Sequence, residues 1–96
     1  MAEDQNVIDN QAAHRFEFAA DGHRAVLTYT IDGALFTLVH TVVPDELGGR
    51  GIGGLLVRAA VDRAVADGLT IVPHCPFARS WLEKHPDIAE TVDIDR

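Results

Sequence analysis

The chain has 96 residues, of which 47% are hydrophobic and 24% charged, the composition of one globular domain. Its formal net charge of −7 argues against broad nucleic-acid binding, which depends on a basic surface. No apolar run approaches the roughly 20 residues of a membrane span, and residues 1–6 lack the order of a signal peptide. The lone cysteine, Cys75, has no partner for an internal disulfide, so we expect a reducing cytoplasm.

The N-terminal residues predict a tail followed by a strand. Residues 1–13 are polar and acidic without a sustained period, so we expect a flexible tail ahead of one domain over 14–96. From His14 onward, aromatic and charged residues alternate, which is typical of a half-buried strand. Asp21-Gly22 then supplies a turn.

Two further strands are predicted over 24–31 and 34–43. Asp32-Gly33 between them is a strong hairpin signal, because a two-residue type I′ turn needs positive φ at both positions. The three strands therefore form an antiparallel meander. Alternation along the third strand predicts one face with Phe36, Leu38, His40 and Val42, and an opposite face with Leu35, Thr37, Val39, Thr41 and Val43.

Five glycines then lie between the third strand and a helix expected over about 51–67. Glycine lets the backbone approach a ligand closely, and the free N–H groups of a first helical turn bind anions. We therefore expect this loop to hold a pyrophosphate. The alternative is a tight structural turn. Five glycines are more than a turn needs, because each costs about 0.5–1 kcal/mol of ordering free energy relative to alanine.

Beyond the helix, residues 69–72 predict a short apolar strand parallel to the third strand. Prolines break it within 73–76, a second helix is expected over 77–85, and 87–96 is an acidic tail of undefined order. The predicted fold class is thus α/β with a mixed sheet (α+β), in the order β-β-β-α-β-α.

Two common phosphate-binding motifs do not fit the loop. A P-loop requires a Gly-Lys pair, which the chain lacks. Residues 49–54 spell the dinucleotide motif G-x-G-x-x-G, but they follow an antiparallel meander, and the position about 20 residues farther on is His74 instead of an acidic residue.

Residues 48–53 instead resemble the acetyl-CoA loop of the GNAT N-acetyltransferase superfamily, Gln/Arg-x-x-Gly-x-Gly/Ala. Gly51 and Gly53 match its two glycines, whereas Gly48 stands where Gln or Arg is expected and Arg50 is placed to supply the missing charge. With the Pro-x-Cys-Pro motif at 73–76, the chain over 14–86 is similar to the very short single-domain GNAT-like proteins.

This resemblance implies a minimal GNAT-like acyl-CoA acyltransferase fold, with acetyl-CoA as cosubstrate and no metal. It also implies that backbone groups of the third strand and the loop bind the cosubstrate. The implied residues are Thr41, Val42, Val43, Gly48, Gly49, Arg50, Gly51, Ile52, Gly53 and Gly54.

Two residues are catalytic candidates. Cys75 follows the strand where the resemblance puts the thioester, so it is placed to relay the acetyl group or protonate the leaving thiolate; a small buried apolar residue is the alternative. Phe77 stands near the position of the acidic tyrosine of larger relatives. His40 is a candidate to take the proton of an incoming amine, or a core histidine, and His74 is equally ambiguous. A zinc site is disfavoured because paired ligand spacing is absent.

The sequence therefore predicts a small cytoplasmic N-acetyltransferase that moves an acetyl group from acetyl-CoA to a primary amine of a small molecule or protein. It predicts neither a nucleic-acid nor a membrane partner, and it is compatible with a homodimer. The alternative is a non-catalytic acyl-CoA sensor or interaction module of the same fold. A domain that has lost its ligand, suggested by Gly48, is a third possibility.

Overall fold

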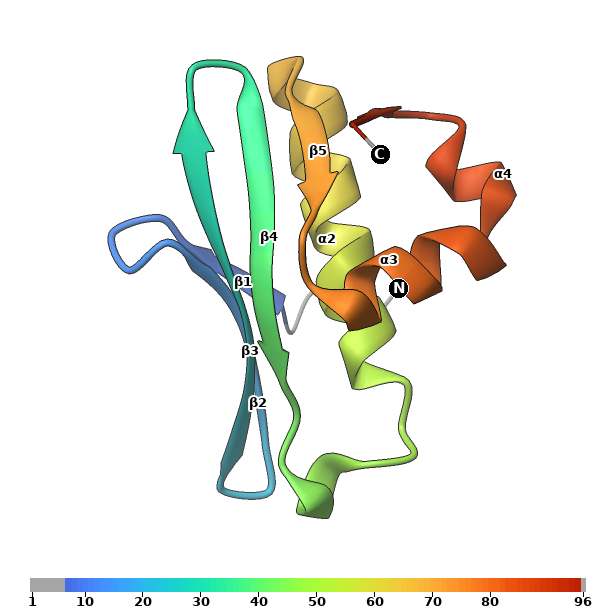
Figure 1. Cartoon of the computed structure of the whole chain (residues 1–96). Coiled ribbons are helices and arrows are strands. Elements are labelled where there is room, and N and C mark those ends of the chain that lie inside the picture. The colour runs from blue at the N-terminus through green and yellow to red at the C-terminus, as the bar shows by residue number, and fades with distance from the viewer. Residues whose placement is uncertain (1–6, 96) are drawn as a thin grey trace.

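A six-stranded sheet in the order β1-β2-β3-β4-β5-β6 forms the framework (Figure 1). The computed structural model describes residues 7–95. The strands are β1 (Val7–Asn10), β2 (Arg15–Ala20), β3 (His23–Asp32), β4 (Leu35–Val42), β5 (Thr70–Pro73) and β6 (Asp93–Ile94). The helices are the 3-10 turn η1 (Asp45–Leu47), α2 (Ile52–Asp67), α3 (Pro76–Lys84) and α4 (Pro86–Ala89). None of these described helices is long and apolar enough to cross a membrane.

The strand directions confirm the predicted mixed sheet. Strands β1 to β4 pair antiparallel, while β5 runs parallel to β4 and β6 runs parallel to β5. The β3–β4 turn is Gly33-Ala34, one residue later than the predicted Asp32-Gly33, and only Gly33 has positive φ, at 60°. A type II′ turn needs positive φ at its first central residue alone, so the predicted type I′ turn is wrong.

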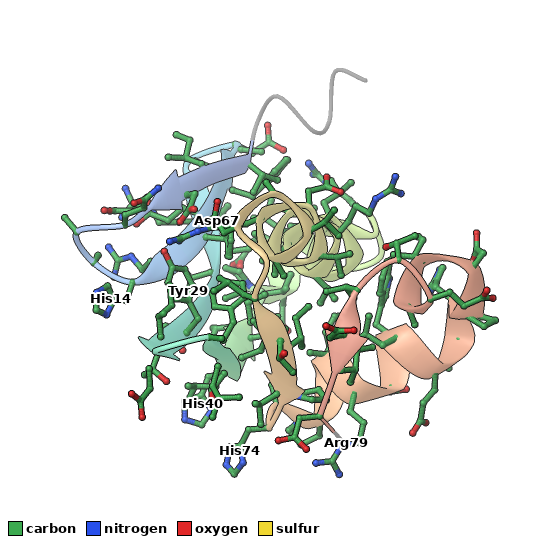
Figure 2. The ribbon with its side chains drawn as sticks, turned by 90° about the horizontal axis from the view of Figure 1, so that it is seen from above. His14, Tyr29, His40, Asp67, His74 and Arg79 are labelled. Carbon is green, nitrogen blue, oxygen red and sulfur yellow. The ribbon has the colours of Figure 1, made fainter. Side chains whose placement is uncertain are left out.

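Helix α2 covers one face of the sheet, where the core lies (Figure 2). Its buried positions recur with a helical period, which explains why this segment forms an amphipathic helix. The opposite face carries no helix within the part of the chain that the structure describes. The core combines residues of α2, namely Leu56, Val57, Ala60, Val61 and Ala64, with sheet residues that include Phe16, Leu27, Phe36, Leu38 and Ile71.

Strand β4 contains an extra residue, which changes the predicted faces. Tyr29 pairs with Leu38 and Thr28 pairs with His40, so Val39 has no partner in β3. Such a bulge reverses the alternation of side chains beyond it. Thr41 pairs with the buried Leu27 and lies on the core side, whereas His40 is exposed on the open side. The predicted shared face of His40 and Val42 with Phe36 and Leu38 is therefore wrong.

Both predicted tails contain regular structure. Strand β1 lies within the expected tail 1–13, whose residues 1–6 are outside the described residues. Strand β6 and all of α4 except Pro86 lie within the expected tail 87–96. The prediction of a tail is thus wrong for Val7–Asn10. These residues form a strand because residues distant in sequence hold them. The Asp9 carboxylate accepts hydrogen bonds from Tyr29 and Arg63 at 2.6 and 2.9 Å.

The Tyr29 hydroxyl is the centre of this contact. It donates to Asp9 Oδ1 and accepts from Arg63 Nη1 at 2.7 Å, linking β1, β3 and α2. Tyr29 is 2% exposed, and burial together with the hydrogen bond to Asp9 raises its pKa to about 12.

Tyr29 is the only tyrosine, so its ionisation can be followed directly by absorbance near 295 nm. We expect the folded protein to keep this proton between pH 10 and about 12, and urea to return the midpoint to about 10. Because the unfolded chain loses the proton first, the free energy of unfolding should fall by roughly 1.4 kcal/mol per pH unit in that window. A native midpoint near 10 would contradict this.

Helices α2 and α3 approach closely because two glycines face aromatic rings. A Cβ added at Gly53 would lie 2.7 Å from Cζ of Phe77, and one added at Gly54 would lie 2.5 Å from Nε1 of Trp81. These distances leave no room for a methyl group. The glycines therefore set the position of α3 against the first turn of α2.

We expect Gly54→Ala to destabilise the protein by roughly 1–2 kcal/mol in urea denaturation, because overpacking outweighs the gain in helix propensity. The matched test is a double-mutant cycle with Trp81→Leu, in which the smaller side chain should relieve most of the cost of the alanine. An increase in stability from Gly54→Ala alone would show that the helices do not meet at this residue.

Candidate functional site

The loop after β4 leaves the first turn of α2 without a side-chain cap. Gly49 and Gly51 adopt left-handed φ of 77° and 73°, which side chains resist. Gly51 is the N-cap of α2 and offers no side chain to accept hydrogen bonds from the first turn. The first turn also contains no acidic residue. No side chain therefore caps the first-turn N–H groups at the positive end of the helix dipole, although Ile52 and Gly53 of this turn are buried.

A cavity of about 410 Å³ lies at this helix end. Its wall includes Phe77, which is 44% exposed, and Trp81, the two rings that meet Gly53 and Gly54. Sequence reasoning missed these aromatic walls, although adjacent glycines in a helix are a signal of close approach. The lining residues are Val43, Pro44, Asp45, Leu47, Gly48, Gly49, Gly51, Ile52, Gly53, Gly54, Phe77 and Trp81.

Most residues of the predicted cosubstrate site line this cavity, but Thr41, Val42 and Arg50 do not. Arg50 instead forms an ion pair with Asp21 of the β2–β3 turn at 2.8 Å. Both side chains are at least half exposed, and such pairs contribute about 0–1 kcal/mol. The pair is therefore weak enough for a phosphate to displace the carboxylate.

Strands β4 and β5 diverge beyond the bulge. Their last paired residues are Leu38 and Pro73, after which Cys75 N–H donates to the Leu38 carbonyl at 2.9 Å. The chain then turns into α3, while β4 continues to Val42. Within the described residues, positions 39–42 consequently have no strand partner on the β5 side. This open edge leads directly to Val43 and Pro44 of the cavity wall.

Cys75 lies where the two strands separate. It is 3% exposed, and its Sγ is 3.2 Å from the Thr41 hydroxyl, with either atom able to donate. The sequence predicted only a backbone role for Thr41, because the bulge that turns its side chain toward Cys75 was not recognised. The thiol is thus held at the inner end of the open β4 edge.

The other catalytic candidate, His40, does not join Cys75. The bulge places His40 on the exposed sheet face, and Figure 2 shows its side chain with His74 on the side away from α2. Of the two candidates, only Cys75 lies between the strands. Across residues 7–95, no three His, Cys, Asp or Glu side chains cluster as ligands for a metal ion.

Comparisons with known proteins point to one family. A family profile described as GCN5-related N-acetyl-transferase matches residues 15–91. Two similar proteins are Protein NATD1 from mouse and Protein NATD1 from human. Each is 38% identical to this chain over 64 residues, which is 66% of this chain. The chain spans only 58% and 57% of those two proteins. The NMR structure of a GCN5-like candidate N-acetyltransferase from Staphylococcus aureus aligns with a TM-score of 0.69 at 32% identity, covering 86% of this chain and 84% of that one.

Proposed function

Because the chain belongs to the GCN5-related N-acetyltransferase family, we propose that it binds acetyl-CoA and transfers the acetyl group to a primary amine. The observation that carries this proposal is the uncapped end of α2 beside a cavity that continues into the open edge of β4. The first part suits a diphosphate, and the second suits an amide-containing arm that pairs with a strand. A lone cysteine favours a cytoplasmic location for this activity.

In this proposal the α2 amides and the loop from Gly48 to Gly54 bind the pyrophosphate. The backbone of Thr41, Val42 and Val43 pairs with the pantetheine arm. The thioester then lies near Cys75 and the bulge, because these positions terminate the open edge.

The protein has to supply a group that stabilises the oxyanion, a proton donor and a proton acceptor. A neutral amine attacks the thioester carbonyl, and a backbone N–H of β4 stabilises the oxyanion. The carbon–sulfur bond breaks, the Cys75 thiol protonates the leaving thiolate, and the new amide nitrogen loses its proton to His40 or water. Solvent then returns a proton to the Cys75 thiolate. The amine approaches from the open sheet face, where His40 is exposed.

A non-catalytic acyl-CoA sensor is the second candidate function. It is favoured by Phe77, which offers no acid at the start of α3, and by the low exposure of Cys75. The open sheet face would then bind a protein partner or a second copy of the chain. Stabilisation by acetyl-CoA without acetylation of any amine in a broad panel would support this alternative.

Binding is tested by thermal unfolding with acetyl-CoA. At a concentration 100 times its Kd, acetyl-CoA should stabilise the protein by about 2.7 kcal/mol through mass action, which raises the melting temperature by several degrees. Gly48 provides a matched charge test because its φ of −64° accepts any side chain. We expect Gly48→Asp to weaken binding about tenfold and Gly48→Arg to preserve or strengthen it.

Gly48→Ala is the control for the added Cβ, which lies 3.2 Å from the Asp45 carbonyl oxygen in every variant. The sign of the introduced charge should decide the order of affinities. Equal affinity of the Asp and Arg variants for acetyl-CoA would show that the diphosphate does not bind at this helix end. No thermal shift at millimolar acetyl-CoA would refute acetyl-CoA binding altogether.

The role of Cys75 is tested separately by turnover. Cys75→Ala should lower kcat about a hundredfold, because it removes the proton donor, with the affinity for acetyl-CoA unchanged. Cys75→Ser, which keeps a hydroxyl beside Thr41, controls for the loss of that contact. Full turnover of the alanine variant would show that Cys75 serves only in packing. The proposal that the chain binds acetyl-CoA would not be affected by that result.

A further inference from the structure

A second cavity, of about 450 Å³, opens at the carboxyl end of β5 between α3 and β6. Its apolar wall is formed by Val72, Pro73, Leu82 and Ile94. Figure 2 shows His74 and Arg79 at the same edge of the molecule. The remaining lining residues are His74, Arg79, Glu83 and Asp95.

The charged residues of this cavity are not paired with one another. Arg79 and Glu83 are spaced i,i+4 on α3, yet no ion pair joins them within the described residues. The same arginine-to-acid spacing on α2 does produce ion pairs, Arg58–Asp62 at 3.7 Å and Arg63–Asp67 at 3.2 Å. The cavity therefore presents positive and negative groups separately.

Strand β6 fixes the position of the acidic side. Asp95 N–H donates to the Ile71 carbonyl at 2.8 Å, which holds the end of β6 against β5. Asp95 and Glu83 thus belong to different elements that meet at one cavity, with Arg79 beside Glu83 on α3. A ligand with both charges satisfies this arrangement, because each charge meets an opposite one.

We propose that this cavity binds an α-amino acid with an apolar side chain. Arg79 receives the carboxylate, Glu83 and Asp95 receive the ammonium group, and the wall of Val72, Leu82 and Ile94 receives the side chain. Pro73 and His74, which precede Cys75 in the chain, line the cavity. The amino acid is then the acetyl acceptor: its ammonium group loses one proton to solvent before the neutral amine attacks, and this role rests on the proposed acetyl transfer.

Binding is measured without acetyl-CoA, by ¹⁵N NMR titration of the full chain with three probes. L-Leucine carries both charges, L-leucinamide lacks the carboxylate, and N-acetyl-L-leucine lacks the ammonium group. We expect L-leucine to bind at least about tenfold more tightly than either analogue and to shift the amide signals of Arg79, Glu83 and Asp95.

Matched variants assign the two charges. Arg79→Gln should reduce the affinity for L-leucine about tenfold and leave the affinity for L-leucinamide unchanged. The double variant Glu83→Gln with Asp95→Asn should leave the affinity for N-acetyl-L-leucine unchanged. Arg58→Gln, an exposed arginine on α2, is the control and should change none of them. Equal affinity of Arg79→Gln and wild type for L-leucine would overturn the proposal.

The outcomes separate this inference from the acetyl-CoA proposal. Binding of L-leucine by a protein that does not respond to acetyl-CoA would support the cavity and refute acetyl transfer. A protein that responds to acetyl-CoA but shows no shifts at this cavity with L-leucine would refute the inference alone. N-Acetylation of L-leucine, lost in Arg79→Gln at low substrate concentration, would support both.

Discussion

The extra residue in β4, Val39, is the constraint on which the candidate site depends. Because side chains alternate along a strand, one unpaired residue reverses every position beyond it. Thr41 is thereby turned toward Cys75, and His40 toward the open face. Regular alternation would have placed His40 in the core and left Cys75 without its hydroxyl partner. The bulge also coincides with the divergence of β4 from β5, so one local irregularity creates both the open edge and its inner end.

Much of the fold was predictable because its signals are local. Asp32-Gly33 indicated a hairpin, the glycine-rich loop indicated a strand-to-helix transition, and a strand that returns after a helix indicated parallel pairing with β4. Even the hairpin was displaced by one residue, since Gly33 with Ala34 satisfies a type II′ turn as well as Asp-Gly satisfies type I′. Turn chemistry identified the connection more reliably than its register.

The remaining features depend on contacts between distant residues. The pattern of β4 has apolar and polar residues on both faces after Leu38, so the sequence does not reveal where the alternation reverses. Strand β1 is too short for a period, and it is held by Asp9, whose partners Tyr29 and Arg63 lie on other elements. The second cavity was missed for the same reason, because Asp95 lies in a predicted tail that pairs with β5.

The close contact of α2 and α3 links the two cavities mechanically. Gly53 and Gly54 let Phe77 and Trp81 pack against the first turn of α2, so the position of α3 is set at the N-terminal end of α2. The same helix carries Arg79, Leu82 and Glu83 of the second cavity and begins beside Cys75. Because closely packed groups transmit strain, a movement of α3 away from α2 would change both cavities. The glycines of α2 thus set the spacing between the two cavities.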